Sequence, residues 1–224
     1  MIEATKTGPQ TVDTTAGLPG SGSLADELKA TTREAHTKAE RHPIQARMIS
    51  GRMDRAEYVT YLSQNLAVWQ ALDTGLASAR DPRVVGFRRA YHEHAPRILA
   101  DIAHLNGGKP VDAPLPATLD FVRLIKTVSD GPGLLGVWYV LEGSTNGGRF
   151  IAKALGPALG LSGPDGLRTL DPHGEAQRER WSAWRAGLDA QVFTPAERQM
   201  IIAAANDTFS AMYDMMEGMV AARQ

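Results

Sequence analysis

The amino-acid sequence predicts a single all-helical domain of about seven or eight helices. Three observations support this prediction. Apolar residues recur at spacings of three and four over long stretches, which is the period of an amphipathic helix. Capping residues and prolines precede these stretches, and glycines or proline-rich loops end them. No run of alternating apolar and polar residues is long enough to indicate a β-strand.

The individual elements follow from these signals in chain order. Residues 1–22 are rich in Thr, Gly and Pro, so we expect a disordered tail before a helical domain of residues 23–224. The residues expected to cap helix N-termini include Ser23, Asp54, Asp81 and Thr194. Pro96 is expected to kink the third helix. The predicted helices span, to within a few residues, positions 23–41, 54–76, 82–107, 117–129, 132–155, 174–190 and 196–222.

Composition excludes several classes of function. The 224 residues carry a formal net charge of −1, which provides no basic field for nucleic acid. Cysteine is absent, so disulfides, thiolate metal sites and cysteine nucleophiles are excluded. The longest apolar stretch, residues 134–141, is too short to span a bilayer. The N-terminus has neither a basic start nor an apolar segment, so we expect a cytoplasmic protein.

The first predicted helix carries a candidate site beside its core-facing side. At 100° per residue, the apolar arc comprises Leu24, Leu28, Thr32, Ala35 and Ala39. Lys29, Arg33, His36 and Glu40 lie together on one flank of this arc. A carboxylate at i+4 can accept a hydrogen bond from one imidazole nitrogen and leave the other for a metal, and the two cations suit an anionic ligand. The alternative is an ordinary solvated face of ion pairs.

The fifth predicted helix contains Gly143, Gly147 and Gly148 in its interior. Each interior glycine costs about 1 kcal/mol relative to alanine, so the three need a reason. They remove side chains from one region, which either lets a ligand approach the backbone or lets another helix pack closely. A phosphate-binding loop is disfavoured because no strand precedes these glycines and no Gly-Lys-Ser/Thr follows them. Together, a histidine helix and a glycine helix suit a planar ligand such as a porphyrin, whose iron takes the imidazole and whose propionates take the cations.

Both segments resemble the heme oxygenase family. The carrying motifs are LKATTREAHTKAER and WYVLEGSTNGGRFIAKAL, in the family's order and at a similar separation, closest to bacterial members including those associated with bacteriophytochromes. The resemblance covers residues 24–219 and implies the family's helical fold. It further implies oxidative cleavage of heme, which is both substrate and cofactor, to biliverdin, CO and ferrous iron. The implied partners are O2 and an external electron donor, such as a ferredoxin- or flavodoxin-type reductase system.

The resemblance also implies a role for each matching residue. His36 matches the axial iron ligand and Glu40 the carboxylate that hydrogen-bonds it. Gly143 and Gly147 match distal glycines that approach the heme and bound oxygen. The other matches are Gly148 beside them, Lys29, Arg33 and Arg185 near the propionates, and Phe209 in the pocket wall.

Ser144 departs from the pattern of many family members, including the animal enzymes. These carry an aspartate directly after the first distal glycine, where it organises the water that protonates bound peroxide. Several bacterial members are similar to this chain in having serine there, so activity is still expected, with an undetermined proton path. The alternatives are a heme-binding or heme-storage protein without turnover, or a di-iron or thiaminase-like enzyme of the same architecture.

The remaining histidines, tryptophans and methionines have less specific interpretations. A second possible metal cluster comprises His92, Glu93, His94, Asp101 and His104. Asp101 and His104 have the spacing of a di-iron motif, but the chain shows no convincing second copy. His42 and His173, each next to a proline, are expected at the surface. The residues expected in the core or a pocket wall are Trp69, Trp138, Trp181, Trp184, Met212, Met215, Met216 and Met219.

Overall fold

The computed structural model describes residues 22–223, which form ten α-helices and two short 3₁₀ helices and contain no strand. The predicted tail therefore lies almost entirely outside the described residues. The helices in the first half are α1 Leu24–Thr31, α2 Arg33–Glu40, α3 Pro43–Ile49, α4 Arg55–Ser78, α5 Pro82–Val85, η1 Ala90–His92 and α6 Ala95–Asn106. Those in the second half are α7 Pro116–Val128, α8 Gly133–Ala158, η2 Gly174–Ala176, α9 Gln177–Asp189 and α10 Pro195–Ala221. The all-helical prediction is confirmed.

Local capping chemistry explains why four of the helices begin where the sequence predicts. The side chains that accept a backbone N–H at a helix start are Ser23 from Asp26, Asp54 from Glu57, Asp81 from Arg83 and Thr194 from Glu197. At α10 the Glu197 carboxylate also accepts the Thr194 N–H, which completes a capping box. These contacts satisfy N–H groups that have no partner inside the helix.

Three differences raise the number of α-helices from the seven predicted positions to ten. The first predicted helix is divided at Thr32, whose hydroxyl donates to the Leu28 carbonyl at 2.7 Å. Pro96 does not kink a continuous helix; it lies in the first turn of α6, where a missing N–H costs nothing. The unpredicted α3 starts at Pro43 with His42 as its cap, a residue type that is not among the usual capping residues.

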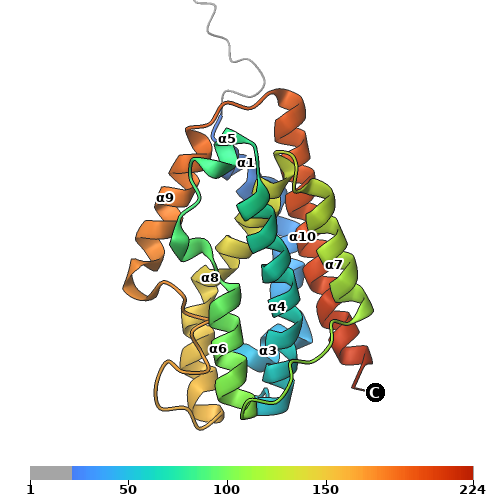
Figure 1. Ribbon diagram of the computed structural model, residues 1–224, viewed down its shortest axis with the longest axis vertical. Coiled ribbons are helices and arrows are strands. Elements are labelled where there is room, and N and C mark those ends of the chain that lie inside the picture. The colour runs from blue at the N-terminus through green and yellow to red at the C-terminus, as the bar shows by residue number, and fades with distance from the viewer. Residues whose placement is uncertain (1–21, 224) are drawn as a thin grey trace, which may run out of the picture.

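The long helices α4, α8 and α10 run roughly along the longest axis of the molecule, with α9 on one side and α7 on the other (Figure 1). Helix α10 packs against α8, α7, α2 and α1. At Gly136 the backbones of α8 and α10 approach so closely that a Cβ would lie 2.9 Å from the Ala205 nitrogen. Helix α10 is therefore the element on which both the histidine helix and the glycine helix are mounted.

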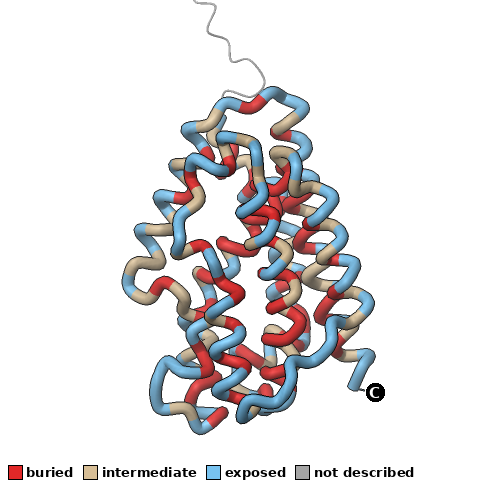
Figure 2. Tube along the Cα trace, in the orientation of Figure 1, coloured by how far each residue is buried: buried red, intermediate tan, exposed pale blue. Residues whose placement is uncertain are grey.

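The core lies between these helices, where buried positions gather on their inner sides (Figure 2). Its largest fully buried side chains include Trp138, Tyr58 and Phe121. Trp69 and Trp184 are also buried, as are Met215, Met216 and Met219, whereas Trp181 and Met212 are half-buried against the core. Of the helices in residues 22–223, none is long and apolar enough to cross a bilayer.

Candidate functional site

His36 lies on α2 with its imidazole half-exposed, at 52% of its side-chain surface. Its Nδ1 is 3.4 Å from Oε2 of Glu40, one turn further along the helix, which is longer than a typical hydrogen bond. The ring also meets Phe209 of α10 in a T-shaped contact, at 5.4 Å between centroids. Within residues 22–223, Nε2 has no hydrogen-bond partner. The predicted contact of His36 with Glu40 is thus present in loose form, and Phe209 lies against the same ring.

The predicted cations lie around the N-terminal half of the histidine helix. Lys29 of α1 and Arg33 of α2 are both exposed. Arg185 of α9 reaches back to α1, where its Nη2 is 2.7 Å from Oδ1 of Asp26. The three positive charges are therefore carried by the first two helices and by a helix that packs on the first. Such an arrangement suits the carboxylates of an anionic ligand.

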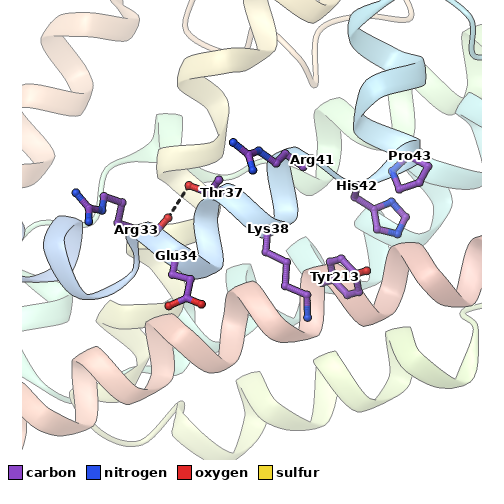
Figure 3. A pocket seen from close by; sticks show the side chains of 8 residues that line it. All are labelled: Arg33, Glu34, Thr37, Lys38, Arg41, His42, Pro43 and Tyr213. Carbon is purple, nitrogen blue, oxygen red and sulfur yellow. Dashed lines mark hydrogen bonds between the residues drawn. The ribbon is translucent and has the colours of Figure 1, made fainter.

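A hollow of about 690 Å³ lies on another face of α2 (Figure 3). Arg33, Lys38 and Arg41 line it, together with the Tyr213 ring, over which the Lys38 ammonium lies at 4.2 Å. His36 does not line this hollow. At 100° per residue, His36 points well away from the centre of the lining positions. The hollow is therefore centred away from His36, and Arg33 lies between the two.

The three glycines of α8 differ in what surrounds them. A Cβ on Gly148 would overlap the carbonyl oxygen of Leu170 and lie 2.8 Å from its carbon, so close packing explains that glycine. A Cβ on Gly143 would lie 3.2 Å from the indole ring of Trp181, a tight contact. A Cβ on Gly147 would meet nothing within 4 Å. Packing therefore leaves Gly147 unexplained, and this glycine opens a bare patch of helix backbone.

The polar side chains between these glycines donate hydrogen bonds to backbone carbonyls of α8. Ser144 Oγ donates to the Leu141 carbonyl at 2.7 Å, and Thr145 Oγ1 donates to the Glu142 carbonyl at 2.7 Å. Asn146 Nδ2 donates to the Gly143 carbonyl at 2.8 Å. Such bonds compete with the helical pattern and promote bending. Ser144 is exposed, and its hydroxyl proton is engaged, so its oxygen is left as an acceptor.

The expected surface positions of His42 and His173 are wrong, because both side chains are buried in polar networks. His42 accepts the Ile44 N–H as the cap of α3, and its Nε2 is 2.8 Å from Glu217 of α10. His173 meets Glu142 of α8 through Nε2 at 2.7 Å. Both partners are distant along the chain, so the adjacent prolines gave no signal for burial.

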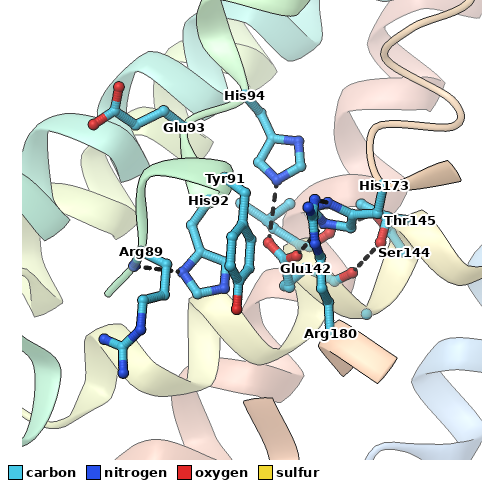
Figure 4. Close-up of polar contacts among 12 residues, drawn as sticks. Arg89, Tyr91, His92, Glu93, His94, Glu142, Ser144, Thr145, His173 and Arg180 are labelled. Atoms are coloured by element: carbon cyan, nitrogen blue, oxygen red, sulfur yellow. Dashed lines mark hydrogen bonds and ion pairs between the residues drawn. The ribbon is translucent and has the colours of Figure 1, made fainter. Parts of the chain in front are cut away.

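The residues of the second possible metal cluster, considered from the sequence, do not gather at one place in the structure. His94 lies with Glu142 and His173 in a buried cluster, and its Nε2 is 3.2 Å from Glu142 Oε2 (Figure 4). Asp101 instead accepts the backbone N–H groups of Gly166, Arg168 and Thr169. Both oxygens of this carboxylate are therefore occupied by the loop of residues 166–169.

The new cluster has unusual electrostatics. Burial raises the pKa of Glu142, but hydrogen bonds from His173 and His94 outweigh it and bring the pKa to about 2. Burial lowers the pKa of the neighbouring His92 to about 4, so this imidazole is neutral at pH 7. Ligand atoms of His94, Glu142 and His173 all lie within 4.8 Å of one another, which is the arrangement of a possible metal site.

Comparison with protein families gives a match over residues 22–218 to the model described as heme oxygenase. The chain belongs to the heme oxygenase family. Among solved structures, heme oxygenase from Leptospira interrogans is 22% identical with a TM-score of 0.79, covering 87% of this chain and 98% of that one. Heme oxygenase-2 from Synechocystis sp. PCC 6803, in complex with heme and NO, is 21% identical with a TM-score of 0.83, covering 90% and 86%.

The same fold also occurs outside heme oxygenases. A TenA homolog from Pseudomonas syringae is 12% identical with a TM-score of 0.61, covering 88% of this chain and 93% of that one. Comparison with curated protein sequences gives no match. At these identities the structural likenesses establish the fold, and the chemistry has to be argued from the site.

Proposed function

We propose that this protein is a heme oxygenase, which opens heme to biliverdin, CO and ferrous iron with O2 and electrons from a ferredoxin- or flavodoxin-type reductase system. The single observation that carries the proposal is His36. It is a half-exposed imidazole with a free Nε2, backed by Glu40 and Phe209, in a chain whose family match spans residues 22–218. Two of the heme oxygenases of like fold are described in complex with heme, which supports heme as the substrate.

The residues of this chain fit such a substrate. Nε2 of His36 would hold the heme iron, and the Glu40 carboxylate, 3.4 Å from Nδ1, favours the tautomer with its proton on Nδ1. Lys29, Arg33 and Arg185 are the candidate partners of the propionates. To bind a propionate, Arg185 must give up part of its contact with Asp26.

The opposite face of the site is assigned to the glycine segment of α8. Gly147, with open space where a side chain would be, lets a flat ligand approach the helix backbone. Gly143 and Ser144 lie one turn before it, and Gly148 is held by packing on Leu170. Heme supplies the oxygen-activating iron, and the protein orients the ring and delivers protons.

The proton path has to work with Ser144. Its hydroxyl donates to the Leu141 carbonyl, so the oxygen can accept a hydrogen bond from a water molecule. Of the two amide N–H groups of Asn146, only one donates to the Gly143 carbonyl, and the other can donate to water. We assign these groups to holding ordered water, which carries the proton in place of the aspartate that many family members have.

The test separates turnover from binding alone. The heme-free protein is mixed with one equivalent of hemin, and a ferredoxin-type donor is added in air with catalase present to remove free peroxide. The Soret band should bleach while the broad red absorption of biliverdin rises. A ferrous–oxy complex that persists and returns to ferric heme would instead identify a heme-binding protein, the alternative raised by serine at position 144 in place of the aspartate of many family members.

A further inference from the structure

A buried carboxylate directly precedes the first glycine of the α8 glycine segment, residues 143–148. Glu142 is 2% exposed, and each of its oxygens meets an imidazole: Oε1 lies 2.7 Å from Nε2 of His173, and Oε2 lies 3.2 Å from Nε2 of His94. Beyond His173, Nη1 of Arg180 lies 2.9 Å from Nδ1 (Figure 4). The chain of contacts therefore joins α8 to the segments that precede α6 and α9, and to α9 itself.

The contact with Arg180 determines which ring nitrogen of His173 carries the proton. A guanidinium only donates hydrogen bonds, so Nδ1 of His173 accepts and carries no proton. The proton of the neutral ring must then be on Nε2, where it donates to Glu142. His173 thus bridges a cation and a carboxylate as a neutral ring. Arg180 is itself held over the Tyr91 ring at 4.3 Å.

The same contact argues against a metal ion between His94, Glu142 and His173. A metal on Nε2 of His173 needs the lone pair of that nitrogen and leaves the proton on Nδ1. That proton would face an N–H of Arg180, so two donors would oppose each other. A divalent ion would also add positive charge beside a guanidinium in a buried site. Both Glu142 oxygens and the Nε2 atoms that face them already have hydrogen-bond partners without a metal.

Gln177, which lies between His173 and Arg180, also contacts the next turn of α8. Gln177 Nε2 donates to Thr145 Oγ1 at 2.9 Å and to Asn146 Oδ1 at 3.1 Å. Residues 173–180 therefore hold α8 at positions 142, 145 and 146. This is the stretch that interior glycines and back-bonded side chains make easiest to deform.

We propose that Glu142, His94, His173 and Arg180 form a metal-free brace that fixes the α8 glycine segment, with Glu142 as a positioning residue for the face that carries Gly147. Each member joins a different part of the chain to the same carboxylate, directly or through His173. Loss of one carboxylate oxygen as an acceptor therefore removes one of the two imidazole contacts. The catalytic consequence rests on the proposed function, but the brace itself does not, since it exists without heme.

The first experiment is amide hydrogen exchange on the heme-free protein. Glu142→Gln keeps the shape, but its amide nitrogen cannot accept the second imidazole N–H, so one histidine contact is lost. Exchange in residues 143–148 should then accelerate by about tenfold or more. The matched control is Glu57→Gln, which removes another buried carboxylate, held by Arg47 at 2.6 Å and Arg223 at 2.8 Å on α4. It should leave residues 143–148 unchanged. Equal exchange in Glu142→Gln and wild type would overturn the brace.

A second pair of variants separates a brace from a metal site. In His173→Gln, the amide oxygen can accept from Arg180 while the amide nitrogen donates to Glu142, so protection of residues 143–148 should be kept. His173→Ala offers neither group and should lose it. Stoichiometric, tight Zn²⁺ or Co²⁺ binding by the wild type that disappears in His173→Gln would overturn the proposal in favour of a metal.

The heme complex gives a separate readout. Glu142→Gln should lower kcat by about tenfold while the Kd for heme changes less than about twofold, because the brace orients α8 without touching the ligand. An unchanged kcat together with faster exchange would refute the positioning role and keep the brace. If wild type itself shows no turnover, the proposed function fails and the exchange result still decides the brace.

Discussion

Gly147 and Gly148 are neighbours on α8, yet alanine should change the stability of the protein in opposite directions at the two positions. Alanine is favoured over glycine in a helix interior by about 1 kcal/mol. At Gly147 a Cβ would meet nothing within 4 Å, so this gain is realised. Gly147→Ala should raise the free energy of unfolding by about 0.5–1 kcal/mol, or the Tm by about 2–3 °C.

At Gly148 the same methyl group overlaps the Leu170 carbonyl oxygen and comes within 2.8 Å of the carbonyl carbon. Both atoms belong to the backbone, so no side chain can rotate away. Overpacking of this kind costs about 1–3 kcal/mol or more, which exceeds the helical gain. Gly148→Ala should therefore lower the free energy of unfolding by about 1–2 kcal/mol.

The assay is urea unfolding of the heme-free proteins, followed by far-ultraviolet circular dichroism, with m-values checked for constancy. Gly147→Leu then extends the test to the ligand, since it should weaken cyanide binding to the heme complex far more than it changes unfolding. The same sign of stability change for both alanine variants would refute the reasoning, as would equal losses of stability and cyanide affinity in Gly147→Leu.

Three further predictions concern the histidines and the cations. His36→Ala should shift the Soret and spin-state bands of the ferric heme complex, whereas the exposed control His104→Ala should not; unchanged spectra for His36→Ala would remove it as the ligand. Arg185→Ala should alter the biliverdin isomer pattern on chromatography while costing only about 0.2–1 kcal/mol of stability, and an unaltered pattern would assign the propionates to other residues. The pKa of His92 is lowered from 6.5 to about 4, so between these pH values the unfolded chain binds a proton that the folded chain does not. The Tm should therefore decrease as the pH is lowered from 6.5 to 4. His92→Asn should flatten this part of the profile, and identical profiles would contradict it, while the Glu142 contribution should be lost only as pH falls from about 4.5 toward 2.

Local signals made the helices and the histidine helix predictable from the sequence. The caps at Asp54 and Thr194 involve residues only three positions apart, so they are visible without knowing the fold. The His36 and Glu40 pair is one helical turn apart and is visible for the same reason. Thr32 shows the limit, because α1 and α2 are divided there although no glycine or proline in the sequence marks the position.

Contacts between distant segments were not predictable in this way. Glu142 meets residues 48 and 31 positions away, and neither histidine has a local feature that indicates burial. The packing of Gly148 depends on Leu170, which lies in the segment between α8 and η2. Periodicity places Gly143, Gly147 and Gly148 in one helix, but only the neighbours decide which of them is open.

The most direct test of the account is the yield of CO from a single turnover. Wild-type protein with one equivalent of heme, reduced by a ferredoxin-type donor in air with catalase present, should release one equivalent of CO and one of ferrous iron per heme lost. A CO-binding globin and a ferrous chelator measure the two products. Loss of heme without CO would mean uncontrolled degradation rather than ring opening at a meso carbon, and it would contradict the assignment of His36 and the α8 glycine segment to a heme oxygenase site.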